Sequence, residues 1–315
     1  MTHTFFACVI RNVIKFLFES EIIFTFASNN NPTILSEMDK LLILLAAILP
    51  SVLLLWFIWK KDPVPEPFSW LAKAFFWGVG LCIPIATIEV GIQMLLFGQP
   101  ELQPNSILQA FAIAFLVAAI PEEAGKLYVL NSIVKKNPHF DEHVDGIVYA
   151  VCVSLGFATL ENIGYVFGSG EDWLQVAISR SLLAVPGHYA FAVAMGYYFS
   201  LYYFVERSTK NRVCILAVPV VLHGFYDSLC FSAGVVDPAI GVVCVIVLLI
   251  FCYKMHRYAY KRIQEQIARD AAAEVKDTFD RDDIRQERER ANNTNSWQSQ
   301  DNGDLPKDSM ANLWH

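Results

Sequence analysis

The chain has 315 residues, of which 55% are apolar and only 17% are charged, and its mean hydropathy is +0.38. Soluble domains carry roughly a quarter of charged residues, so this composition excludes an ordinary soluble protein and indicates a membrane protein. Much of the acid behind the net charge of −7 follows Met255, and basic residues do not alternate with aromatic residues on a polar face, so nucleic-acid binding is excluded.

The first element is an N-terminal extension, residues 1–37. Its apolar residues between Phe5 and Phe18 recur at helical spacing, opposite Arg11 and Lys15. One interpretation is an amphipathic helix lying in the membrane interface. The other, which we favour, is that the natural unit begins at Met38, directly before the first long apolar segment.

Seven apolar segments follow, each long enough to cross a bilayer. A transmembrane helix needs about 20 mainly apolar residues, and these segments cover residues 40–59, 71–97, 107–134, 144–167, 173–204, 213–231 and 238–255. We therefore predict an all-α fold, a polytopic membrane helix bundle of about seven transmembrane helices within residues 38–255. Residues 256–290 should form a charged, solvated helix, and residues 291–315 a disordered tail.

Charges in the connections predict the orientation of the bundle. Lysine and arginine occur between the first and second segments, the third and fourth, the fifth and sixth, and after the seventh. The alternate connections, 98–106, 168–172 and 232–237, contain neither. Because positive residues concentrate on the cytoplasmic side, the start of the first helix should lie outside and the C-terminus in the cytoplasm.

Ionisable residues interrupt these apolar segments. Each costs at least about 2.5–3.5 kcal/mol near the bilayer centre if charged, so the set must be satisfied by mutual contacts, a water-filled cavity or a metal. Its members are Glu89, Glu122, Glu123, Lys126, Glu161, Arg180, His188, His223 and Asp227.

The third segment contains the sequence Pro121-Glu122-Glu123-Ala124-Gly125-Lys126. Glu122 and Lys126 share a helix face and could simply neutralise each other. That pair leaves Glu123 unexplained. Two adjacent carboxylates in a low dielectric do not easily both ionise, so one of them is suited to act as a general base near neutral pH.

The fourth and fifth segments add a carboxylate and a histidine. Glu161 lies on the same helix face as Phe157 and directly precedes Asn162. A structural ion pair of Glu161 with Arg180 or Lys126 is nearly as plausible as a catalytic role. Before His188, the pair Pro186-Gly187 can bend the helix and free backbone groups. A lone membrane histidine is more often a hydrogen bond between helices than a ligand.

The sixth segment contributes His223 and Asp227, four residues apart on one face, where the carboxylate can orient the imidazole. The predicted orientation places these groups at compatible depths, from the middle of the membrane toward its outer side. We therefore expect one outward-leaning cluster. His188, His223 and Glu123 also form a candidate zinc set, in which the metal or a glutamate would activate water.

These motifs, in this order on successive helices, resemble the PrsW family of intramembrane proteases. The resembling residues are Glu122, Glu123 and Lys126; Phe157, Glu161 and Asn162; Arg180 through His188; and His223 with Asp227. The family is similar to the type II CAAX prenyl proteases and the Abi group, but Glu161 stands where the CAAX proteases carry histidine. The resemblance covers about residues 38–255.

The resemblance implies a multi-pass endopeptidase of the bacterial plasma membrane, catalogued as metal-dependent. It also implies that a single-span membrane protein, such as an anti-sigma factor, is cut on the extracytoplasmic side. Two alternatives from other classes stay open: a proton-coupled transporter, since proton relays use the same residue types, and a non-catalytic receptor or scaffold. The two halves of the bundle share no repeated motif of the kind many transporters show.

Overall fold

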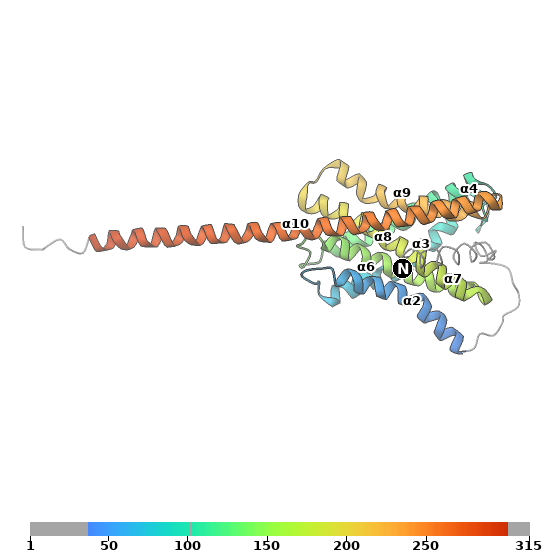
Figure 1. The fold of residues 1–315 in the computed structure, drawn as a ribbon, viewed down its shortest axis with the longest axis horizontal. Coiled ribbons are helices and arrows are strands. Elements are labelled where there is room, and N and C mark those ends of the chain that lie inside the picture. Colours follow the sequence, from blue (N-terminus) through green and yellow to red (C-terminus); the bar gives the residue numbers. More distant parts are fainter. Residues whose placement is uncertain (1–36, 101, 302–315) are drawn as a thin grey trace, which may run out of the picture. The chain divides into compact units, whose positions relative to one another are not determined.

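The computed structural model describes residues 37–100 and 102–301, and within these ranges it contains helices and no strand (Figure 1). The α-helices are α2 (Glu37–Trp59), α3 (Phe68–Phe97), α4 (Ile107–Ala112), α5 (Ile120–Val134), α6 (Asp145–Gly168), α7 (Trp173–Ser179), α8 (Val185–Ser200), α9 (Thr209–Ala233) and α10 (Pro238–Asp301). Three π-helical segments, η1 (Ile113–Ala119), η3 (Arg180–Ala184) and η4 (Leu201–Val205), and one 3₁₀ turn, η2 (Gly170–Asp172), continue or connect them.

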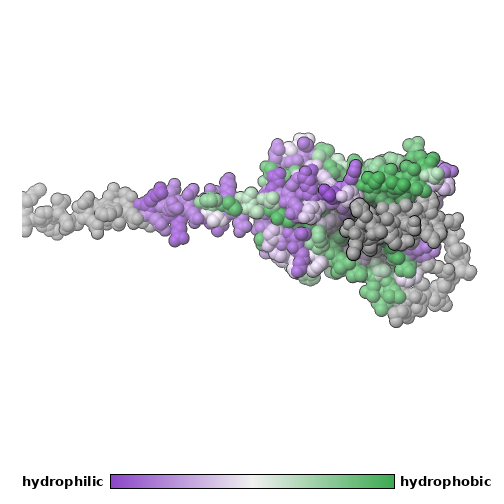
Figure 2. Space-filling view, viewed as in Figure 1, coloured by the Kyte–Doolittle hydropathy of each residue, from purple (hydrophilic) through white to green (hydrophobic). Residues whose placement is uncertain are grey.

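Among the described residues, seven helical stretches are long and apolar enough to cross a membrane, which confirms the predicted fold class. They cover Leu41–Trp59, Phe68–Phe97, Ile107–Val134, Asp145–Gly168, Trp173–Val205, Thr209–Ala233 and Pro238–Arg290. Large apolar side chains such as Leu95 and Phe76 are exposed on the outside of the bundle. Figure 2 shows hydrophobic surface on one face of the bundle. In a bilayer this surface faces the lipid chains.

The chain divides at residue 267 into the helix bundle and a second unit formed by the remainder of α10. In that unit residues 271–290 are exposed, and ion pairs at helical spacing join Arg281 to Asp277 and Arg285 to Glu289. The helix continues to Asp301, beyond residue 290, where the sequence predicts its end. The predicted N-terminal helix, in residues 1–36, and the end of the tail, residues 302–315, lie outside the described residues.

Helix α6 is the centre of the bundle and packs on α2, α3 and α8. Its contact with α8 is made backbone to backbone, because a Cβ atom on Gly196 would lie 2.3 Å from the carbonyl oxygen of Gly146. Its contact with α3 is equally close, since a Cβ on Gly156 would lie 2.0 Å from the carbonyl oxygen of Phe75. Small residues allow such approaches between membrane helices, and they bring together the helices that carry the site.

The connections that contain lysine and arginine gather at one end of the bundle. Carboxylates of Asp62 and Glu142 approach within 4.8 Å, which joins the α2–α3 connection to the α5–α6 connection. Phe140 in the latter stacks on Phe204, at the end of the fifth span. Connections with lysine or arginine therefore lie at one end of the bundle, as the predicted topology requires. The side of the membrane at which this end lies stays a prediction.

Two of the π-helical segments end just before a proline. Segment η1 leads into Pro121 and η3 into Pro186. Proline has no N–H to donate to the preceding turn, and a π-turn accommodates such an interruption without ending the helix; π-bulges occur often at functional sites. The sequence predicts the bend at Pro186 but not these π-turns. Each of the two π-turns is followed directly by residues of the candidate site.

Candidate functional site

The first turns of α5 place two glutamates and a lysine in the interior of the bundle. The Nζ atom of Lys126 lies 2.9 Å from Glu122 Oε2 and 2.8 Å from Glu123 Oε1. Glu123 is fully buried, and Lys126 and Glu122 are nearly so. The Lys126 ammonium also lies 4.5 Å from the ring centre of Phe157, a cation–π contact. The simple neutralisation that the spacing allows is therefore present, and it includes both glutamates.

His188, at the start of α8, joins this group to the next helix. Its Nδ1 lies 3.2 Å from Lys126 Nζ, and its Nε2 lies 2.9 Å from Glu161 Oε2 on α6. Ser154, also on α6, donates a 3.0 Å hydrogen bond to the His188 carbonyl oxygen. The imidazole is thus held between a cation and a carboxylate, so Nδ1 is suited to accept a hydrogen bond and Nε2 to donate one.

Glu161 is held from its other side by Arg180 in the π-turn η3. Arg180 Nη2 lies 3.1 Å from Glu161 Oε2, and its Nε donates to Asn162 Oδ1 at 2.8 Å. The Asn162 amide in turn donates to the carbonyl oxygen of Ala47 on α2, at 2.9 Å. The guanidinium also stacks on Tyr165, 3.9 Å from the ring centre. This chain of contacts orients Glu161 from three helical segments.

His223, on α9, lies between two carboxylates. Its Nδ1 is 3.0 Å from Glu123 Oε1 and its Nε2 is 3.2 Å from Asp227 Oδ2, so it can donate to both only in its protonated form. The same Nε2 is 4.0 Å from Glu122 Oε1. The ring stacks on Phe191 at 4.8 Å between centres, which fixes its plane.

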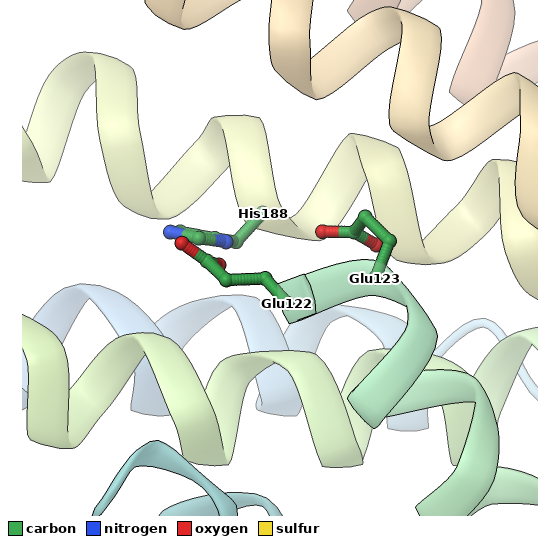
Figure 3. A group of neighbouring side chains, drawn as sticks. All are labelled: Glu122, Glu123 and His188. Carbon is green, nitrogen blue, oxygen red and sulfur yellow. The ribbon is translucent and has the colours of Figure 1, made fainter. Parts of the chain in front are cut away.

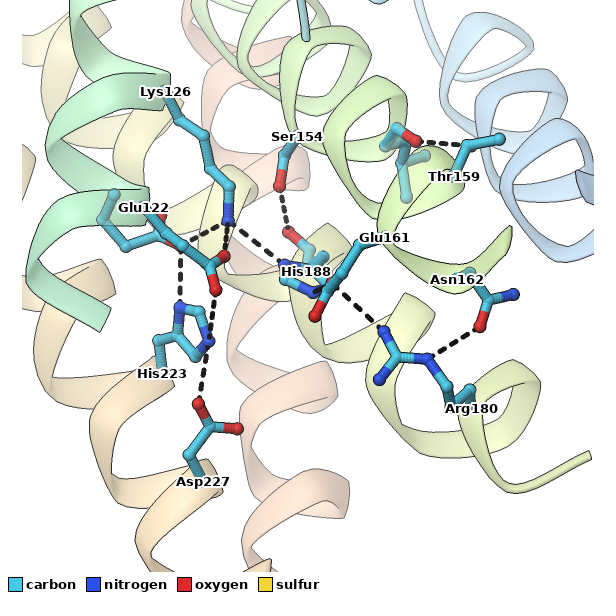
Figure 4. A network of polar contacts seen from close by, with 12 residues as sticks. Glu122, Lys126, Ser154, Thr159, Glu161, Asn162, Arg180, His188, His223 and Asp227 are labelled. Carbon is cyan, nitrogen blue, oxygen red and sulfur yellow. Dashed lines mark hydrogen bonds and ion pairs between the residues drawn. The ribbon is translucent and has the colours of Figure 1, made fainter. Parts of the chain in front are cut away.

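The structure thus brings all ten residues predicted for the site into one network from four membrane segments. They are Glu122, Glu123, Lys126, Phe157, Glu161, Asn162, Arg180, His188, His223 and Asp227. Figure 4 labels eight of them, all except Glu123 and Phe157. The network has a buried side and an accessible side: the side chain of Glu123 is 0% exposed, whereas that of Glu161 is 20% and that of Asp227 16% exposed. A substrate would reach the network along the Glu161 and Asp227 side.

Glu122, Glu123 and His188 could hold a metal ion, since one donor atom from each lies within 4.8 Å of the others (Figure 3). Carboxylate and imidazole are donors that zinc uses, and the buried Oε2 of Glu123 has no hydrogen-bond partner among the described residues. The donor set fits a metal. A metal would displace the Lys126 ammonium, which contacts all three residues.

This set differs from the predicted set of His188, His223 and Glu123. Both nitrogens of His223 contact the carboxylates of Glu123 and Asp227, whereas those of His188 contact Lys126 and Glu161. The described residues group Glu122 with Glu123 and His188, and the set that includes His223 stays a prediction. Sequence spacing cannot distinguish the two, because it does not give the distance between helices.

Glu89 on α3 is a residue whose position the sequence did not predict. It has no motif partner, so the sequence suggests only a structural or accessory role. In the structure its carboxyl group is half-buried and close enough to Glu122 and Glu161 for electrostatic interaction. The signal available in the sequence was a carboxylate in an otherwise apolar segment, which alone does not indicate the helices it approaches.

Comparisons with known proteins agree with this geometry. Residues 66–253 match the family described as PrsW family intramembrane metalloprotease. Protease PrsW of Clostridioides difficile is 33% identical over 226 residues, which cover 69% of this chain and 89% of that protein. The proteins of the same name from Geobacillus kaustophilus and Bacillus subtilis are 40% and 38% identical and are covered over 76% and 81% of their lengths. No solved structure matches the chain.

The family match includes every residue of the network, and the relatives are named as proteases. The comparisons therefore support proteolysis over the transporter and receptor alternatives. With seven membrane-spanning helices and a buried cluster of carboxylates and histidines, the chain belongs to the PrsW family of intramembrane proteases.

Proposed function

We propose that this protease cuts a single-span membrane protein near the extracytoplasmic end of its helix, with the network on α5, α6, α8 and α9 as the catalytic site. The observation that carries the proposal is the convergence of carboxylates and histidines from these helices inside a membrane bundle. An intramembrane ionisable cluster of this kind is a functional site by default. The bacterial relatives and the charged connections favour the plasma membrane as its location.

Glu122 is the better placed of the two glutamates to act as general base. Its Oε2 is held by Lys126, while its Oε1 is 4.0 Å from His223 Nε2. Two atoms that share one water through hydrogen bonds of about 2.8 Å lie about 4 Å apart when the bonds meet near a right angle. A water between Glu122 and His223 would be positioned to lose a proton to the carboxylate and attack the scissile carbonyl carbon.

Glu123 and Asp227 would position His223 and would not themselves exchange protons with the water or the substrate. They contact its two ring nitrogens from opposite sides, and Glu123 is fully buried. A protonated His223 or the His188 ring could donate a hydrogen bond to the oxyanion that forms on the peptide carbonyl, once its contact with Asp227 or Glu161 is released. Lys126 would balance the charge of the paired glutamates, and Arg180 would hold Glu161 in place.

In the metal-dependent version of this site, Glu122, Glu123 and His188 would hold the ion, with zinc as the candidate. A bound zinc supplies a polarised carbonyl and a water of lowered pKa. Around the ion, Glu161 would still orient His188, and Asp227 would still orient His223. If purified protein holds no stoichiometric metal and chelators leave cleavage unchanged, the zinc version is wrong.

The substrate must present an accessible peptide bond. A transmembrane helix has its backbone hydrogen bonds satisfied, so cleavage should occur near the outer end of the substrate helix or at a helix-breaking residue. The family resemblance suggests an anti-sigma factor in stress signalling as one such substrate.

The test is to trap the substrate with a Glu123→Gln variant in membranes, identify the bound protein by mass spectrometry, and map its cleavage by the wild type. We expect a single-span protein cut near its extracytoplasmic membrane boundary. A cut at the cytoplasmic boundary would contradict the predicted orientation. Proton flux through proteoliposomes containing the protein, with no cleavage of any trapped partner, would favour transport.

A further inference from the structure

A second group of buried carboxylates lies outside the catalytic network, where the connections 60–67 and 135–144 meet the start of α6. Asp62, Glu66 and Asp145 are 5%, 7% and 0% exposed. Hydrophilic residues in a loop are normally solvated, and burial of an uncompensated carboxylate costs several kcal/mol or more. Glu66 and Asp145 lie side by side in this group, so the burial of their two carboxyl groups has to be compensated.

The carboxylates converge on Asp145. Oxygen atoms of Asp62, Glu142 and Asp145 lie within 4.8 Å of one another, and the same holds for Glu66, Asp141 and Asp145. The two triads share Asp145 and draw on both connections as well as on α6. Asp141 is exposed, so the group opens to solvent on that side.

Asp145 has one oxygen with partners and one without. Its Oδ2 accepts hydrogen bonds from the backbone N–H groups of Asp141, at 3.0 Å, and Glu142, at 2.8 Å. Its Oδ1 is fully buried and has no hydrogen-bond donor among the described residues. The two backbone hydrogen bonds fix the orientation of the Asp145 carboxylate, and its Oδ1 then lies among the other carboxylates of the group.

The centre of this group, Glu66 and Asp145, lacks a lysine or arginine partner among the described residues, while His139 is close enough to Glu66 for an electrostatic interaction. The nearby Lys60 and Lys61 lie over the rings of Trp56 and Phe57, at 5.6 and 5.7 Å. Glu66 accepts a hydrogen bond from the hydroxyl of Tyr149, and its side chain also lies within hydrogen-bond reach of Asp145.

We propose that this cluster, Asp62, Glu66, Asp141, Glu142 and Asp145, binds a divalent cation that prefers oxygen ligands, Ca²⁺ or Mg²⁺. A donor set made of carboxylates suits these hard cations rather than zinc, which prefers sulfur and nitrogen. The prolines at positions 63, 65, 67 and 138 restrict the two connections that supply the ligands. The ion would tie the α2–α3 connection to the α5–α6 connection and to the start of α6.

The test uses the full-length protein in detergent, stripped of metal with EDTA. Binding of Mn²⁺, a paramagnetic probe of oxygen sites, is measured by electron paramagnetic resonance, and the melting temperature is followed with added CaCl₂ or MgCl₂. We expect binding of Mn²⁺ that Ca²⁺ or Mg²⁺ displaces, together with a melting temperature that rises with cation concentration. Asp145→Asn, which keeps an oxygen for the backbone N–H groups, and Glu66→Gln should each weaken binding about tenfold or more.

Two control variants assign the binding to this cluster. Glu206→Gln removes an exposed carboxylate from the 206–208 connection and should leave binding unchanged. Glu123→Gln alters the catalytic network and should also leave binding unchanged, so the result does not depend on the proposed proteolytic function. Loss of binding in Glu123→Gln with retention in Asp145→Asn would mean that the ion sits in the catalytic network, which would overturn the proposal.

Protons are the other way to neutralise the cluster. Burial raises the pKa of the Glu66 carboxyl, and a carboxyl group with a raised pKa stabilises the folded protein less as the pH rises above the usual carboxylate range. A melting temperature that falls with rising pH and does not respond to either cation would overturn the proposal. Since Glu66→Gln is a neutral isostere, it provides a folded variant if Asp145→Asn does not fold.

Discussion

Replacing Gly196 with alanine should push α8 away from α6 and disturb the site that the two helices share. The new Cβ would lie 2.3 Å from the carbonyl oxygen of Gly146 and 2.5 Å from the Cα of Ile147, about 1 Å closer than an ordinary contact. Both neighbours are backbone atoms of a buried helix, which cannot rotate aside. Overpacking of this kind costs about 1–3 kcal/mol, and the helix propensity gained by replacing glycine returns up to about 1 kcal/mol.

With this gain subtracted, the net loss of up to about 2 kcal/mol should lower the melting temperature by up to about 8 °C, measured by thermal unfolding in detergent. The 2.9 Å contact between Glu161 and His188 crosses the same helix pair. A displacement of about 1 Å there should reduce cleavage up to about 100-fold.

The matched control is Gly80→Ala on α3, where an added Cβ would meet nothing within 4 Å. This variant should melt at or above the wild-type temperature and should cleave normally. Equal melting temperatures for the Gly196 and Gly80 variants would refute the conclusion that α6 and α8 touch through their backbones.

The remaining predictions concern the network itself. Glu122→Gln should lower kcat about 10²–10⁴-fold with little change in melting temperature, because the amide oxygen still reaches Lys126; a kcat near that of the wild type would remove Glu122 as the base. Arg180→Lys should lower both activity and melting temperature, because a single ammonium cannot hold Glu161 and the Asn162 amide at once; unchanged activity would show that Arg180 does not position Glu161. Lys126→Met should abolish cleavage, since it leaves two buried glutamates without their shared cation; retained cleavage would contradict its charge-balancing role.

Hydropathy predicted the spans because the bilayer sets their length and composition; the third span was expected at 107–134 and is found at Ile107–Val134. The convergence of the ionisable residues followed from the same physics, since each must face the protein interior. The contacts inside the cluster were not predictable in the same way. That Lys126 lies between Glu122, Glu123 and His188 depends on helix packing and side-chain rotamers, for which spacing along the chain gives no distances.

Other features lay beyond any periodic pattern. The π-turns before Pro121 and Pro186 are small changes of helix geometry, and no residue type marks them uniquely. The buried carboxylates around Asp145 lie partly in connections, where charged residues are expected to be solvated. Helix α10 runs to Asp301, past the residue 290 at which the composition predicts its end, and the predicted disorder of the tail stays a prediction.

The most direct test of the central claim is the rate at which the reconstituted protein cleaves its trapped single-span substrate. The comparison is between the wild type and the variants Glu122→Gln, Glu123→Gln and His223→Asn, each shown to insert into the membrane and to fold. If the network is the proteolytic site, cleavage is lost in all three variants. Full cleavage in all three would contradict the assignment and would require the active site of this protease to be sought elsewhere in the bundle.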